Sequence, residues 1–305
     1  MLDISADPAR NRALNANDAH LQEISVNPAV YGCPEGQLAF YFHGVPGAPI
    51  EAQMLHQAAL EHGIRLQVVE RNLPSELSSE AYLNELAQQI SAAAAGQPIR
   101  LIGFSIGACL ALRVAARLGD RVTTVYLLSA AAPLQIPSNS VGMGAGRYTF
   151  LWAQRYPRLF LAFAWYQALL AKLSPSLLLN LLFAGAGGKD PELLRQADTR
   201  AWLANIQRAC FKHGTTGYAR DVKLYVEPWA AELAKVTAAV SLWHGEADNW
   251  APLAMSVYLQ RNLANASQLT RCTGQAHYGC LLENAHAVMA SVQRDSLSMQ
   301  PRTMP

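Results

Sequence analysis

A serine flanked by glycines stands between two segments of different hydrophobic pattern. Gly103-Phe104-Ser105-Ile106-Gly107 follows the apolar run Ile99 to Ile102, and the apolar residues of Ile106 to Leu118 have helical spacing. A strand that turns at once into a helix strains the backbone of the serine, and side chains two positions either way would collide. We therefore expect Ser105 to project from the turn as a nucleophile beside the positive end of the helix. A plain glycine–serine turn is the alternative.

A serine hydroxyl becomes a nucleophile only when a base takes its proton, and that base needs a carboxylate to hold its tautomer. Asp248 lies in the loop after the apolar run Val236 to Trp243, and His277 lies between the run Ser267 to Arg271 and the last helical segment. Both loops should leave the carboxyl ends of strands, on the same rim as Ser105. These three side chains are the predicted catalytic set.

Other residues could take these roles. Glu246 shares the loop of Asp248, but its position nearer the strand favours a part in shaping the turn. Glu70 follows the run Arg65 to Val69 and could also reach the rim, where a solvated side chain is more usual. His244 is expected to be partly buried with backbone partners. Four further histidines are expected on helices or at the surface: His56, His62, His213 and His286.

A second loop could stabilise negative charge. His43-Gly44-Val45-Pro46-Gly47 follows the apolar run Leu38 to Phe42. Attack on an ester carbonyl creates an oxyanion that needs N–H donors, each worth about 3 kcal/mol. The backbone N–H groups of Ile106 and Val45 are the candidates, since Pro46 has no N–H. His43 is expected to brace the loop, and an ordinary Pro-Gly turn is the alternative.

Composition narrows the class of protein. The 305 residues are 51% hydrophobic and 15% charged, and 24 Lys and Arg balance 22 Asp and Glu to a net charge of +2. The charge balance gives no electrostatic reason to expect nucleic acid as a partner, and the high apolar fraction excludes a disordered chain. Five cysteines without a CxxC pair or metal-ligand spacing favour free thiols in a reducing compartment, and neither a metal nor an organic cofactor is expected.

The sequence also predicts a cytoplasmic location. Residues 1–17 contain no apolar segment of the kind a signal peptide has. The uncharged apolar run Leu159 to Ala171 would form a helix of roughly 20 Å, short of the ~30 Å hydrocarbon core of a bilayer. We therefore expect no transmembrane segment.

Strand-like and helical segments alternate along most of the chain. Short apolar runs alternate with helical segments up to residue 132 and again from residue 230, which predicts parallel strands joined by crossover helices. Between residues 133 and 229 the alternation stops and the pattern is helical. We expect one α/β core domain, 1–132 and 230–305, with a helical cap at 133–229.

Four segments together resemble those of the α/β-hydrolase superfamily. They are HGVPG at 43–47, GFSIG at 103–107, LWHGEADNWAP at 242–252 and GQAHYG at 274–279. The resemblance is to bacterial members with a helical cap inserted after the sixth strand. It implies that Ser105 is the nucleophile, His277 the base and acid, and Asp248 the orienting carboxylate, with Val45 and Ile106 as oxyanion donors. The segment Glu70 to Ser75 departs from an Asp-x-Pro-Gly-x-Gly turn of many relatives, which should alter only the shape of the pocket.

These predictions describe a serine hydrolase that acts on a small, largely apolar carboxylic ester through an acyl-serine. His43, Phe104, Trp152 and Trp165 are candidate substrate contacts. The wider set of cap side chains that could line an apolar pocket, or simply pack, is Tyr148, Phe150, Leu151, Trp152, Phe160, Phe163, Trp165, Tyr166 and Phe183. The same residues leave open a C–C hydrolase, acyltransferase, amidase, cofactor-free haloperoxidase or hydroxynitrile lyase, or a binding module with negligible turnover.

Overall fold

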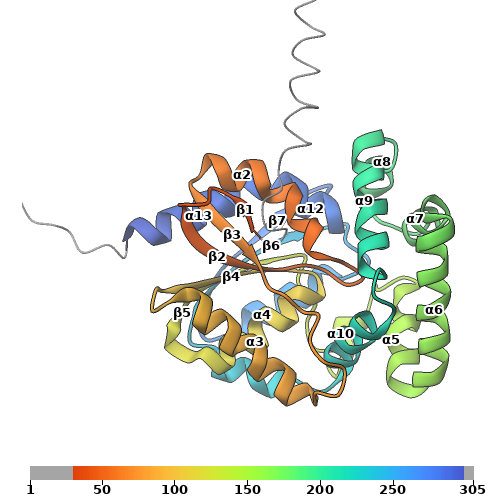
Figure 1. Cartoon of the computed structure of the whole chain (residues 1–305), viewed down its shortest axis with the longest axis horizontal. Helices are drawn as coiled ribbons and strands as arrows, with labels where there is room; N and C mark the ends of the chain where they lie inside the picture. The colour runs from red at the N-terminus through yellow and green to blue at the C-terminus, as the bar shows by residue number, and fades with distance from the viewer. Residues whose placement is uncertain (1–29, 299–305) are drawn as a thin grey trace, which may run out of the picture.

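One sheet of seven strands, in the order β1-β3-β2-β4-β5-β6-β7, forms the centre of the molecule (Figure 1). The computed structural model describes residues 30–298; the segment tested for a signal peptide, 1–17, and the outer ends of the predicted core domain lie outside the described residues. β1 runs antiparallel to β3 and every other pair is parallel. The strands are β1 (Val30–Gly32), β2 (Gln37–Phe42), β3 (Ile64–Val68), β4 (Ile99–Phe104), β5 (Val122–Leu128), β6 (Ala239–Gly245) and β7 (Ala266–Cys272).

Helices cover both faces of this sheet, so its central strands are apolar on both sides. Every residue of β4 is buried, as expected for a parallel strand between two helical layers. One layer contains α3 (Ser79–Ala94) and α4 (Ile106–Leu118); the other contains α2 (His56–Glu61), α12 (His277–Glu283) and α13 (Ala285–Ser298). α11 (Leu253–Asn262) packs on β6 and β7. The predicted α/β class with a mostly parallel sheet is confirmed.

Two helical segments are each divided. The segment between β2 and β3 begins as a 3-10 helix, η1 (Pro49–Leu55), and continues as α2. The last segment consists of α12 and α13, which meet at Asn284, whose side-chain amide donates to the carbonyl oxygen of Cys280.

Six helices between β5 and β6 form an insertion. They are α5 (Gly146–Arg155), α6 (Pro157–Leu173), α7 (Pro175–Phe183), α8 (Asp190–Leu193), α9 (Ala197–Cys210) and α10 (Thr216–Val226). In Figure 1 they stand beside the sheet, with α6 and α7 farthest from it. The insertion follows the fifth strand among the described residues, which begin at residue 30. No helix among residues 30–298 is long and apolar enough to cross a membrane.

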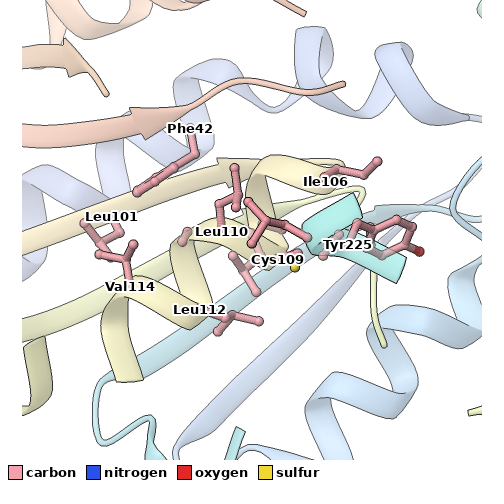
Figure 2. Packing of buried hydrophobic residues seen from close by; sticks show 14 of the residues in the cluster. Phe42, Leu101, Ile106, Cys109, Leu110, Leu112, Val114 and Tyr225 are labelled. Atoms are coloured by element: carbon pink, nitrogen blue, oxygen red, sulfur yellow. The ribbon is translucent and has the colours of Figure 1, made fainter. Parts of the chain in front are cut away.

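The insertion shares the hydrophobic core of the sheet. Figure 2 shows Phe42 and Leu101 from the strands together with Leu110 of α4, while Tyr225 of α10 lies near Cys109. Cys109 and Tyr225 are both almost completely buried. Because one core joins α10 to α4, the helix that follows Ser105, the insertion is anchored close to the candidate nucleophile.

Candidate active site

Ser105 occupies the sharp turn between β4 and α4. Its φ of 56° and ψ of −127° lie where only a constrained non-glycine residue is found. A Cβ at Gly103 would lie 2.6 Å from the Cα of Ala108, and one at Gly107 would lie 2.2 Å from the carbonyl oxygen of Phe42. Both glycines are therefore required by close backbone contacts, and the turn has the strained geometry predicted for it.

His277 and Asp248 form a buried pair. Nδ1 of His277 donates to Oδ2 of Asp248 at 2.7 Å. The other carboxylate oxygen, Oδ1, accepts the backbone N–H groups of Trp250 at 2.9 Å and Ala251 at 3.0 Å. With Nδ1 committed as a donor, Nε2 of His277 is left as the ring's basic nitrogen.

The two members of this pair shift each other's pKa in opposite directions. Burial alone would lower the pKa of His277, but the charge and hydrogen bond of Asp248 outweigh it and raise that pKa. Burial alone would raise the pKa of Asp248, yet His277 holds it below its usual value. Asp248 is therefore ionised at neutral pH and stabilises a proton on His277.

Two further residues hold the backbone around His277. Asp190, a fully buried carboxylate of α8, accepts the N–H groups of Tyr278 at 2.8 Å and Gly279 at 2.9 Å, and so caps α12. Ser129, at the end of β5 with a φ of 44°, donates its hydroxyl to the carbonyl oxygen of His277 at 3.1 Å. Sequence reasoning missed both, because each bond joins segments more than 80 residues apart in the chain.

The loop after β2 is held at both backbone groups of Gly44. The Gly44 N–H donates to Oε1 of Glu51 at 2.8 Å, and the Gly44 carbonyl oxygen accepts from Arg71 at 3.1 Å. Glu51 is fully buried, and its Oε1 also accepts the hydroxyl of Tyr41 at 2.7 Å. The bond from Arg71 fixes the peptide that carries the N–H of Val45, and the bond to Glu51 fixes the peptide before it.

Val45 and Ile106 both line the same cavity as Ser105 and His277. Within residues 30–298, no acceptor is hydrogen-bonded to the N–H of either residue. Ile106 is the first residue of α4, where the helix leaves its amides without internal partners. Two backbone N–H groups without an acceptor among the described residues therefore belong to residues that line the cavity.

Arg71 connects this loop to the insertion. Its guanidinium contacts both ring nitrogens of His43 and forms an ion pair with Asp221 of α10 at 3.4 Å. Burial and the adjacent guanidinium both lower the pKa of His43, so the ring is neutral and can accept from Arg71. Arg220, beside Asp221, donates to the carbonyl oxygens of Arg71 and Leu73. His43 braces the loop, as expected, and does not line the cavity.

The cavity over Ser105 has a volume of about 450 Å³. Of the candidate substrate contacts, Phe104 and Trp152 line it, whereas His43 and Trp165 do not. Trp165 instead lies on the outer face of α6, because residues 163 and 167, which line the cavity, lie on the opposite side of that helix.

Most of the cavity wall is aromatic or aliphatic. Of the wider predicted set, Tyr148, Phe150, Trp152, Phe163 and Phe183 line the cavity, and Leu151, Phe160, Trp165 and Tyr166 do not. Sequence reasoning did not name several other lining side chains, among them Gln167, Gln207, Tyr218, Tyr225, Trp250 and Tyr278.

The alternative acids and bases do not line the cavity, although His244 lies 3.6 Å from Oδ2 of Asp248. Glu246 is exposed and accepts from the hydroxyl of Thr273, and exposed Glu70 accepts from the N–H of Asn72. His244 is fully buried; its Nε2 donates to the carbonyl oxygen of Ala251 at 2.6 Å, and Nδ1 accepts from Ser256 at 2.7 Å. None of these three lines the cavity.

Comparison with known proteins agrees with this architecture. A family model described as the alpha/beta hydrolase family matches residues 43–291. Comparison with curated protein sequences gives no match.

Solved structures share the fold at low sequence identity. A bromoperoxidase from Bacillus anthracis aligns with a TM-score of 0.62 at 17% identity, covering 88% of this chain and 94% of that one. An enol-lactonase from Burkholderia xenovorans gives 0.60 at 14% identity, with 88% and 95% covered. An esterase from Exiguobacterium antarcticum gives 0.58 at 15%, with 87% and 94% covered. Because the family model spans most of the sequence, this chain belongs to the alpha/beta hydrolase family.

Proposed function

We propose that this protein is a serine hydrolase that cleaves carboxylic esters. Ser105 is the nucleophile, His277 the general base and acid, and Asp248 the carboxylate that orients His277. The observation that carries the proposal is the 2.7 Å His277–Asp248 pair, which adjoins the same cavity as the strained Ser105 turn. No metal or organic cofactor takes part in the proposed reaction.

The residues suggest a two-step acyl transfer. Nε2 of His277 takes the proton from Ser105 as Oγ attacks the ester carbonyl carbon, and the N–H groups of Val45 and Ile106 stabilise the oxyanion. Collapse of this intermediate breaks the bond to the alcohol oxygen, which receives the proton from His277. Water then attacks the acyl-serine by the same route and releases the carboxylic acid and the free serine.

The cavity supports an apolar acyl group of moderate size. Its volume of about 450 Å³ falls in the range of small-molecule sites, and its wall is largely aromatic and aliphatic. Residues 133–229 act as a cap in this proposal, since α5, α6, α7, α9 and α10 contribute to the wall. The five free cysteines, including Cys272 and Cys280 with sulfurs 3.9 Å apart, support a cytoplasmic location.

Hydrolysis of p-nitrophenyl esters of increasing acyl length tests the proposal. The wild type should hydrolyse them, with a preference set by the cavity, and Ser105→Ala should lose about three orders of magnitude or more in kcat. Circular dichroism of both proteins shows whether the variant remains folded. A folded wild type that hydrolyses none of the esters, or a Ser105→Ala variant with undiminished activity, would contradict the proposal.

A further inference from the structure

The outer surface of the insertion is strongly apolar. Twelve large hydrophobic side chains are exposed among residues 30–298, and eleven of them lie between Val141 and Leu181. Leu173 is 70% exposed and Trp165 is 64% exposed, both on α6. Only Leu60, on α2, lies elsewhere in that part of the chain. Exposed hydrophobic residues are ordinarily scattered, so this concentration indicates a surface that binds something.

Helix α6 is apolar on the side that faces solvent. Its buried positions are Phe160, Ala164, Gln167 and Ala171, whose spacing of four, three and four residues marks one face. A surface helix usually presents polar residues on the opposite face. Here that face and its flanks expose Leu159, Leu161, Trp165, Tyr166 and Leu173.

The same surface carries positive charge only. The sequence has no Asp or Glu between Arg121 and Lys189, and the insertion's carboxylates begin at Asp190. Four exposed cations lie on α5 and α6: Arg147, Arg155, Arg158 and Lys172. None of the four forms an ion pair within the described part of the chain. We call these cations and the exposed hydrophobic residues 141–181 the outer face.

The outer face reaches the mouth of the cavity. Tyr148 and Leu181 are both exposed members of that face, and both line the cavity over Ser105. Exposed Gly144 and Gly185 line it as well. A molecule that entered from the outer face would therefore reach Ser105 through this mouth.

We propose that the outer face docks on the surface of an anionic lipid bilayer. Tryptophan, tyrosine and leucine would insert at the level of the headgroups, while the arginines and lysine attract the lipid phosphates. Figure 1 shows α6 and α7 at the edge of the molecule farthest from the sheet, where a planar surface can meet them. Pairing of this face with the same face of a second copy would bring only like charges together, so charge complementarity favours the lipid. The inference rests on the proposed function in one respect, that an apolar ester would pass from the bilayer into the cavity.

Co-sedimentation with vesicles tests the proposal on the full chain. Ser105→Ala should bind phosphatidylcholine vesicles that contain phosphatidylglycerol as tightly as the wild type does. Two double variants should each bind these vesicles at least about tenfold more weakly than the wild type: Arg155→Glu/Arg158→Glu and Trp165→Glu/Leu173→Glu. Leu60→Glu is the matched control, because Leu60 is exposed but lies outside the outer face, and it should bind like the wild type.

Hydrolysis of a short, water-soluble ester by the same proteins separates this inference from the proposed function. The outer-face variants should keep that activity, which also shows that they are folded. Equal binding by all variants, or no vesicle binding by the wild type, would overturn the docking proposal whether or not the ester is cleaved. The docking proposal would also be overturned, in favour of self-association, if the wild type is a dimer that binds no vesicles and the double variant Trp165→Glu/Leu173→Glu is a monomer.

Discussion

The guanidinium of Arg71 donates to the carbonyl oxygen of Gly44 at 3.1 Å and thereby sets the direction of the Val45 N–H. The Gly44–Val45 peptide is trans, so its C=O and N–H point in opposite directions. Holding the carbonyl toward Arg71 turns the Val45 N–H away from it. Arg71 is itself held by Asp221 of α10. A residue outside the cavity thus positions one of the two proposed oxyanion donors.

Replacing Arg71 should therefore lower kcat more than it raises KM. In Arg71→Met the Gly44–Val45 peptide loses its anchor, and we expect kcat on a p-nitrophenyl ester to fall about tenfold to a hundredfold. Arg71→Lys keeps the positive charge but not the paired N–H donors of the guanidinium, so its kcat should lie between those of the wild type and Arg71→Met. A change in KM alone, at unchanged kcat and melting temperature, would show that Arg71 shapes only the pocket.

The charge of Asp190 should be visible in the pH dependence of activity. His277 must be neutral to take a proton, so kcat/KM should rise with pH through its pKa, with a midpoint above 6.5. Asp190 contributes to raising that pKa, so Asp190→Asn should move the midpoint to lower pH. Exposed Asp198→Asn on α9 is the matched control and should not move it. An unchanged profile in Asp190→Asn would restrict Asp190 to a structural role.

Glu51 should make folding stability depend on pH. Burial raises its pKa from 4.5 to about 7, so the folded protein binds this proton more tightly than the unfolded chain does. The free energy of unfolding should consequently decrease as pH rises from 4.5 toward 7, by up to about 3 kcal/mol from this group alone. Urea denaturation across that interval should show a smaller decrease in Glu51→Gln than in the wild type. Exposed Glu35→Gln is the control, and a decrease of the same size in all three proteins would contradict the assignment.

Gly107 should not tolerate a side chain. A Cβ there would lie 2.2 Å from the carbonyl oxygen of Phe42 and 2.5 Å from that of His43, so the backbone at the end of β2 would have to move. We expect Gly107→Ala to lose about 3 kcal/mol or more of stability, together with its activity. Gly217→Ala on α10, where no atom lies within 4 Å of the added carbon, should be neutral or slightly stabilising in the same thermal melts. Equal melting temperatures for both variants would argue against the steric account.

Local sequence patterns predicted the sheet and the Ser105 turn because both depend on neighbours in the chain. An apolar run, a glycine at positions 103 and 107, and a helical repeat after them are enough to indicate a strand, a tight turn and a helix. The bonds that hold the site together are of another kind. Arg71 with Gly44, Glu51 with Tyr41 and Asp190 with Tyr278 each depend on the three-dimensional path of the chain, which no local pattern contains.

Trp165 shows the same limit of local sequence patterns within one helix, because it was a candidate substrate contact but lies outside the cavity. Because α6 is apolar on every side, hydrophobic periodicity does not indicate which face turns toward the cavity. Phe163 and Gln167 face the cavity, and Trp165, two residues from each, faces solvent. Only the packing of α6 against its neighbours decides between the two faces.

Labelling with a fluorophosphonate tests the central claim, that Ser105 is a nucleophile activated by His277. After labelling and trypsin digestion, the wild type should carry a single adduct on the peptide Leu101–Arg113, localised to Ser105 by fragmentation. Ser105→Ala should carry none, and His277→Ala should react more slowly by orders of magnitude. A folded wild type that remains unlabelled, or one that is labelled at another residue, would contradict the account.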